Sequence, residues 1–102
     1  MITARGSNEA VKRLYFRGRL DAEALPELSE ALSAVDLSRH KNIVLNLGGV
    51  TSISSTVIGL LFDFHKRAEQ AQARVALEAA PQHIFSIFRA ISLDQVIAIS
   101  PA

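Results

Sequence analysis

The chain contains no cysteine and no tryptophan among its 102 residues. Without cysteine it can hold neither a disulfide framework nor a thiolate metal site, and the lack of thiols fits a cytoplasmic protein. The sequence also has no large excess of either charge, since it contains 11 Lys and Arg and 10 Asp and Glu. A formal net charge of +1 gives no electrostatic case for binding nucleic acid or an anionic membrane.

Long apolar runs are absent as well. The longest, Val57–Phe62, ends at Asp63 and is far shorter than the roughly 20 residues that cross a bilayer. The first ten residues have no apolar core of the kind found in a secretory leader. We therefore expect no direct membrane insertion. The length predicts a single domain, residues 1–102, with room for a substantial core.

The most informative stretch is Asn42–Ala71, which predicts a strand, a turn and a helix. Ile43–Leu47 is a short apolar run typical of a strand buried on both faces. Gly48 and Gly49 are expected to end that strand. After them the apolar spacing becomes helical. The predicted apolar face of this helix consists of Val57, Leu60, Leu61, Phe64 and Ala68.

Three hydroxyl side chains, those of Ser54, Ser55 and Thr56, stand where this helix begins. The first turn of a helix has unpaired N–H groups and a partial positive charge. A serine there can cap the helix, which is worth about 1 kcal/mol, or it can accept a phosphate. From chemistry alone, capping is favoured. Farther along, Gly59 costs the helix about 1 kcal/mol relative to alanine, so we expect it to permit close approach to a sheet.

The first half of the chain contains a further strand and a further helix. Val11–Arg17 alternates between apolar and polar side chains and predicts a strand that Gly18 ends. Asp21 is suited to capping the helix that follows, and Pro26 belongs in its first turn. The apolar face of that helix consists of Leu25, Leu28, Leu32 and Val35.

The ends of the chain complete the pattern. Met1–Ser7 reads as a short first strand or an arm, with a turn at Gly6–Asn8. Arg74–Glu78 predicts a strand, Pro81 the first position of a third helix, and Val96–Ile99 a last strand. This alternation predicts an α/β fold, with a mixed β-sheet of about five strands and about three helices packed mainly on one side. The apolar face of the third helix consists of Ile84, Phe85, Phe88 and Ile91.

Several stretches resemble the STAS domain, the family of bacterial anti-sigma-factor antagonists. Ile43–Leu47 reads IVLNL where the family has VVLDL, and Ser54–Gly59 reads SSTVIG where it has Asp-Ser-Ser/Thr-Gly-Leu-Gly. The basic, alanine-rich end of the family's helix corresponds to His65–Ala71. Gly18–Asp21 is similar to the family's Gly-x-Leu-Asp, and Ser92–Val96 to its Gly-Leu-Asp-x-Val. The resemblance covers nearly the whole chain and implies a STAS-like fold.

The resemblance also implies a functional site. The family's phosphorylated serine maps onto Ser55, with Thr56 and Ser54 as alternatives. The chain departs from the pattern twice, because Ser54 stands at the aspartate position and Val57 at the first glycine position. Phe62 lies off the main apolar stripe of its helix, which indicates an exposed contact residue. The expected partner-binding residues are Asp21, Ser52, Ser54, Ser55, Thr56, Ile58 and Phe62.

No motif indicates catalysis or a bound metal ion. His40, His65 and His83 have no second ligand at metal spacing. The sequence contains no P-loop, no G-x-G-x-x-G and no G-x-S-x-G. We therefore expect no enzymatic activity, no metal and no cofactor.

The resemblance implies a regulatory module that acts through protein–protein interaction. In the family, the unphosphorylated domain binds an anti-sigma-factor serine kinase and frees a sigma factor, and phosphorylation breaks that complex. The implied partner is such a kinase or another STAS-binding ATPase. Two alternatives remain open, namely a STAS accessory subunit of an ABC-type lipid-transport complex and a stressosome component.

Overall fold

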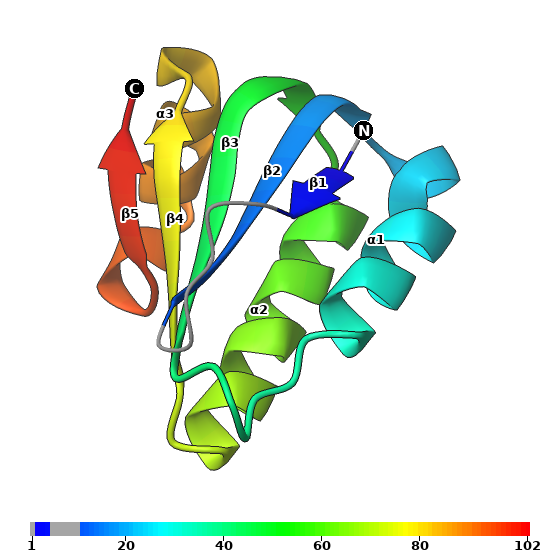
Figure 1. Cartoon of the computed structure of the whole chain (residues 1–102). Helices are drawn as coiled ribbons and strands as arrows, with labels where there is room; N and C mark the ends of the chain where they lie inside the picture. The colour runs from blue at the N-terminus through cyan, green and yellow to red at the C-terminus, as the bar shows by residue number, and fades with distance from the viewer. Residues whose placement is uncertain (1, 5–10) are drawn as a thin grey trace.

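The computed structural model of the chain describes residues 2–4 and 11–102. The strand predicted near the N-terminus is present, and the turn predicted at Gly6–Asn8 lies outside the described residues. No helix in the described ranges is long and apolar enough to cross a membrane. In chain order the elements are β1 (Ile2–Ala4), β2 (Val11–Leu20), the 3-10 helix η1 (Ala22–Ala24), α1 (Leu25–Ser33), β3 (Asn42–Ile53), α2 (Ser55–Gln70), β4 (Arg74–Ala80), α3 (Gln82–Ala90), the 3-10 helix η2 (Leu93–Gln95) and β5 (Ala98–Pro101) (Figure 1).

The strands of the described residues form one sheet of five, in the order β1-β2-β3-β4-β5. Strands β2 to β5 run parallel, and β1 pairs antiparallel with β2. Parallel neighbours cannot be joined by a tight hairpin, so each connection from β2 onward crosses over and contains a helix. The prediction of a mixed α/β sheet with three α-helices is confirmed.

The helices cover one face of the sheet, and that face forms the core. Leu14, Leu45 and Leu77 are aligned across β2, β3 and β4, and each is at most 4% exposed. Figure 1 shows α1 and α2 side by side along the sheet and α3 behind β4 and β5. Alternate strand residues point away from the helices and are half-buried or exposed. The core residues of the α-helices are Leu28, Leu32, Val57, Leu61, Phe64, Ala68, Ile84 and Phe88.

Two basic side chains supply hydrogen bonds at helix ends. Arg67 of α2 donates from Nη2 to the carbonyl oxygen of Leu32, in the last turn of α1, at 2.7 Å. Lys41 donates from Nζ to the carbonyl oxygens of Leu37 and Ala71, at 3.0 and 2.9 Å. The last carbonyls of a helix have no i+4 partner within the helix, so the contacts with Leu32 and Ala71 serve carbonyls at the ends of α1 and α2, while the contact with Leu37 lies in the connection after α1.

The strands continue through the glycines that were expected to end them. Gly18 lies inside β2 with φ of +83°, at a shift in the register with β3. Glycine accepts this backbone without a Cβ penalty, so the strand bulges and continues rather than turning. Gly48 and Gly49 lie inside β3, which runs to Ile53. A Cβ at Gly49 would lie 2.7 Å from the Cβ of Arg17, so this glycine permits the close approach of β2.

Other local predictions also need correction. Gly59 is exposed, and a Cβ built there would meet nothing within 4 Å, so the expected close approach to the sheet is wrong. Pro81 is the N-cap of α3 rather than its first residue. The last strand begins at Ala98, because η2 occupies the preceding turn and leaves Val96 48% exposed. Ile91, expected on the apolar face of the third helix, is its C-cap and is 52% exposed.

Candidate functional site

The candidate site lies where β3 passes into α2. The Ser54 N–H donates to the carbonyl oxygen of Leu20 at 2.9 Å, which ties this junction to the end of β2. Ser54 has an extended backbone, and its Oγ accepts a hydrogen bond from the Val57 N–H at 3.3 Å. Ser54 is therefore the N-cap of α2, and the helix begins at Ser55, one of the two starts, Ser55 or Thr56, that the sequence predicted.

Ser55 and Thr56 occupy the first turn of α2 with exposed side chains. Neither hydroxyl forms a hydrogen bond with another described residue. Because Ser54 supplies the cap, the Ser55 hydroxyl is not required for it. Ser52, near the end of β3, is exposed as well. We call residues 49–56, which comprise the end of β3, Ser54 and the first two residues of α2, the hydroxyl loop; its side chains at 51, 52, 55 and 56 are open to solvent.

Ile58 and Phe62 extend the site along α2. They lie three and seven residues after Ser55, a spacing that places all three on one side of the helix. Both apolar side chains are half-buried and pack against the core. Phe62, predicted to be exposed, is thus partly covered, and the Nζ of Lys66 lies 5.7 Å from its ring centroid.

Asp21 lies in the loop that follows β2. Its Oδ1 accepts a hydrogen bond from the Glu23 N–H at 3.1 Å, so it caps η1. Its Oδ2 lies 3.4 Å from Nη2 of Arg19. The parallel register pairs Leu20 with Ile53, which places the Asp21 loop beside the hydroxyl loop. The structure therefore brings Asp21 to the edge of the predicted site.

His83 is a contact of the hydroxyl loop that the sequence reasoning missed. Its Nε2 lies 2.8 Å from the carbonyl oxygen of Thr51 and joins the first turn of α3 to the loop. The two residues are 32 positions apart. No local pattern could signal this contact, because it depends on how α3 packs against the sheet.

The candidate surface carries no formal charge in its central segment. No Asp, Glu, Lys or Arg occurs between Lys41 and Asp63. The positive end of the α2 dipole is directed toward Ser55. A phosphate group on this serine would therefore place a charge of about −1.5 to −2 on a segment that has no charged side chain of its own. This uncharged stretch is visible in the sequence and could have been used to locate the surface.

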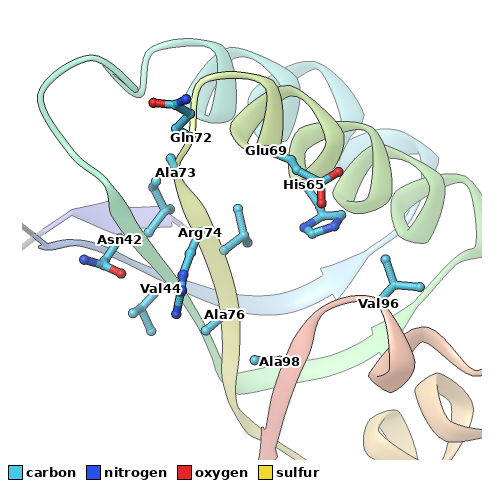
Figure 2. A pocket seen from close by; sticks show the side chains of 12 residues that line it. Asn42, Val44, His65, Glu69, Gln72, Ala73, Arg74, Ala76, Val96 and Ala98 are labelled. Carbon is cyan, nitrogen blue, oxygen red and sulfur yellow. The ribbon is translucent and has the colours of Figure 1, made fainter.

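A cavity of about 600 Å³ lies away from the hydroxyl loop, between the second half of α2 and the start of β4 (Figure 2). His65 and Glu69 line it from α2, and Val96 lines it from the segment before β5. None of the predicted site residues lines this cavity. Within residues 2–4 and 11–102, no group of three or more His, Cys, Asp or Glu side chains is placed to hold a metal ion.

Comparison with known families decides the classification. A family model described as "Mlab, STAS domain" matches residues 3–99. The chain belongs to the STAS family. No protein with a curated description matches this STAS chain.

Solved STAS structures share the fold. An anti-sigma factor antagonist from Mycobacterium paratuberculosis superposes with a TM-score of 0.84 and 18% identity, covering 100% of this chain and 87% of the other. A STAS domain protein from Planctomyces limnophilus gives a TM-score of 0.80 and 20% identity, with 99% and 90% covered. The Bacillus cell fate determinant SpoIIAA, in its phosphorylated form, gives 0.75 and 16%, with 97% and 90% covered. At such identities the likeness shows the fold alone.

Proposed function

We propose that this STAS protein is an anti-sigma-factor antagonist that changes partners when it is phosphorylated. In the unphosphorylated state it binds an anti-sigma-factor serine kinase, and it acts by binding rather than by catalysis. The observation that carries the proposal is the Ser55 hydroxyl, which is exposed in the first turn of α2 beside a cap that Ser54 already supplies. A cytoplasmic location and a role in bacterial transcription regulation belong to the same proposal.

The proposed contact surface combines the hydroxyl loop with the neighbouring loop and one side of α2. Its outer residues contact the partner, while Ser54 acts mainly by fixing the start of the helix. The surface residues are Asp21, Ser52, Ser54, Ser55, Thr56, Ile58 and Phe62.

Phosphorylation would oppose binding through the cost of removing charge from water. The phosphate adds about −1.5 to −2 of charge and three strong acceptor oxygens. At the centre of the contact surface those oxygens lose water on binding, and the partner must replace every lost hydrogen bond. Since Ser54 replaces the family's aspartate, no carboxylate precedes the phosphorylated serine within the hydroxyl loop.

The first prediction concerns Ser55. Ser55→Asp should weaken kinase binding by about 1 kcal/mol or more, because the carboxylate becomes desolvated in the contact. The fold should keep its stability or gain about 0.3–1 kcal/mol, since a negative charge at a helix N-terminus is favourable. Ser55→Ala should preserve binding and abolish phosphate incorporation. Calorimetric titration with the purified kinase, thermal unfolding and mass-spectrometric mapping measure these three outcomes.

Ser86→Asp is the matched control, because Ser86 is an exposed serine on α3, outside the proposed surface. It should leave kinase binding unchanged. If the kinase modifies Thr56 or Ser54 instead, the acceptor moves by one residue and the mechanism remains. If no kinase modifies these hydroxyls and Ser55→Asp binds like the unaltered protein, the phosphorylation switch is wrong. Purification with an ABC-type ATPase would then favour the lipid-transport alternative.

A further inference from the structure

Charge is distributed unevenly between the sheet and the helices. Among the described strand residues the only acidic side chain is that of Glu78. The overall charge of +1 conceals this difference, since the described helices contain six acidic residues and only three basic ones, Lys66, Arg67 and Arg89. The basic residues of the strands are Lys12, Arg13, Arg17, Arg19 and Arg74. The acidic residues of the helices are Glu23, Glu27, Glu30, Asp63, Glu69 and Asp94.

Most of the strand cations lie on the face of the sheet that the helices leave uncovered. Lys12 is the exception, because it is aligned with Ile43, which is buried under the helices. In Figure 2 the side chain of Arg74 lies on the same side of β4 as Val44 and away from His65 on α2. The arginines of β2 each stand next to a residue buried in the helix-covered core, so they point the opposite way. We call the four arginines on this open face, Arg13, Arg17, Arg19 and Arg74, the basic strip.

The strip runs along the strands and ends at the hydroxyl loop. Asn42 of β3 pairs with Val11 of β2 and with Arg74 of β4, so Arg74 is level with the start of β2. At the other end, Arg19 pairs with Ser52 of the hydroxyl loop. With a rise of about 3.3 Å per residue, the strip is about 26 Å long. An extended segment of about eight residues would match that length.

Part of the strip is neutralised within the chain, and part is not. Arg13 donates from Nε and Nη2 to the two carboxylate oxygens of Glu78, at 3.1 and 3.4 Å. Arg19 forms an ion pair with Asp21 at 3.4 Å, although its side chain is 76% exposed. In the described part of the chain, Arg17 and Arg74 form no ion pair and no side-chain hydrogen bond. Two exposed guanidinium groups therefore remain without a compensating charge.

We propose that the basic strip binds an acidic, extended segment of a partner protein. The planar guanidinium group matches a carboxylate with two donors, and the strip already holds the carboxylates of Glu78 and Asp21 through its arginines. This contact goes beyond the proposed function, because it uses the face opposite the helices and requires no phosphorylation.

Two other anionic partners fit the strip less well. A membrane surface is held by basic groups together with inserted apolar side chains. Among residues 11–102 the exposed large apolar side chains are those of Ile87 in α3, Ile91 at its C-cap and Val96 after η2, and none of these elements is part of the basic strip. Nucleic acid requires many neutralised phosphates for useful affinity, and the described part of the strip offers only Arg17 and Arg74 uncompensated.

The test uses a fluorescein-labelled peptide of about eight glutamates, matched to the strip length, and fluorescence anisotropy at low ionic strength. The double variant Arg17→Gln, Arg74→Gln should bind the peptide about fivefold more weakly, as expected for the loss of two exposed charge pairs. The control variant Arg39→Gln, Arg89→Gln removes the same net charge from exposed positions off the sheet and should change affinity less than about twofold. Added salt should weaken binding by the unaltered protein.

The outcomes separate this proposal from its competitors. Equal losses in the two double variants would show a response to net charge alone and would overturn it. Absence of peptide binding would overturn it too, as would tighter, Arg17- and Arg74-dependent binding of phosphatidylserine vesicles or of a short DNA duplex. Ser55→Ala should bind the peptide as the unaltered protein does, because Ser55 is not part of the basic strip, so failure here is distinguishable from failure of the switch.

Discussion

Three residues other than glycine have a left-handed backbone in the described part of the chain. Gln72, Ala79 and Ser92 have φ of 62°, 57° and 61°. For an L-residue with a Cβ this conformation costs roughly 1–2 kcal/mol. Ser92 is the N-cap of η2, but its side chain makes no capping hydrogen bond. STAS sequences usually have glycine at this position, and the left-handed backbone of Ser92 explains that preference.

Replacing Ser92 by glycine should therefore stabilise the protein. Relief of the left-handed backbone gains about 1–2 kcal/mol, and the greater freedom of glycine in the unfolded chain returns about 0.5–1 kcal/mol. We expect Ser92→Gly to raise the free energy of unfolding by about 0.5–1 kcal/mol, measured by urea denaturation. Ser86→Gly, the same change inside α3, should instead lower it. Similar shifts for both variants would contradict the strain argument.

Gly59 presents the reverse case, a glycine inside a helix with no conformational need for it. Because a Cβ there would meet nothing within 4 Å, Gly59→Ala should raise the free energy of unfolding by about 1 kcal/mol. Thermal unfolding tests this directly. A loss of stability would show that the Cβ meets an obstacle. If the variant is more stable yet binds the kinase more weakly, the exposed glycine serves close approach of the partner.

At the scale of the elements, a polar network joins three strands on the open face. Arg13 of β2 bonds to Glu78 of β4, and Asn46 of β3 donates from Nδ2 to Oε2 of Glu78 at 2.7 Å. The Oδ1 of Asn46 accepts from the Gly48 N–H at 2.9 Å. In STAS sequences that resemble this strand, the position of Asn46 carries aspartate. An amide can donate to Glu78, whereas a carboxylate cannot.

Asn46→Asp should therefore destabilise the sheet, because it places two carboxylates within hydrogen-bonding distance. We expect a loss of about 1–3 kcal/mol at neutral pH, measured by chemical denaturation. Adding Glu78→Gln to this variant should recover much of the loss, because the amide introduced on β4 can donate to the new carboxylate on β3. A double-mutant cycle with the two single variants gives the coupling energy between the positions. Additive effects would show that the two side chains do not interact as described.

At the scale of the whole molecule, the order of strands and helices could be predicted from periodicity. The start of α2 could be predicted to within one residue, at Ser55 or Thr56, because capping depends on residues that are close in sequence. The behaviour of Gly18 and Gly49 was not, since glycine marks both turns and bulges. Only the neighbouring strand, through the contact of Gly49 with Arg17, decides between them. The predicted ends of β2 and β3 were wrong for this reason.

The candidate site likewise contains residues that the sequence could predict and contacts that it could not. Ser54 could be identified as a candidate cap, which the structure confirms, and Ser55 could be proposed as the acceptor from its place in the motif. The contact of His83 with Thr51 could not be predicted, because it joins segments that meet only in the folded sheet. The basic strip was also hidden from the sequence. Net charge adds all residues together, whereas the strip depends on which strand residues share a face.

The strand order has a consequence for how the molecule is made. Each strand pairs with the strand that precedes it in the chain, so no strand has to be inserted between two that are already paired. On the ribosome the sheet can therefore grow vectorially, one edge strand at a time, as the nascent chain emerges. The segment from β3 to α2 emerges well before α3 and β5. Its Ser54 N–H can then already donate a hydrogen bond to Leu20 at the end of β2. Apart from the His83 contact, the hydroxyl loop is thus able to take shape before translation ends.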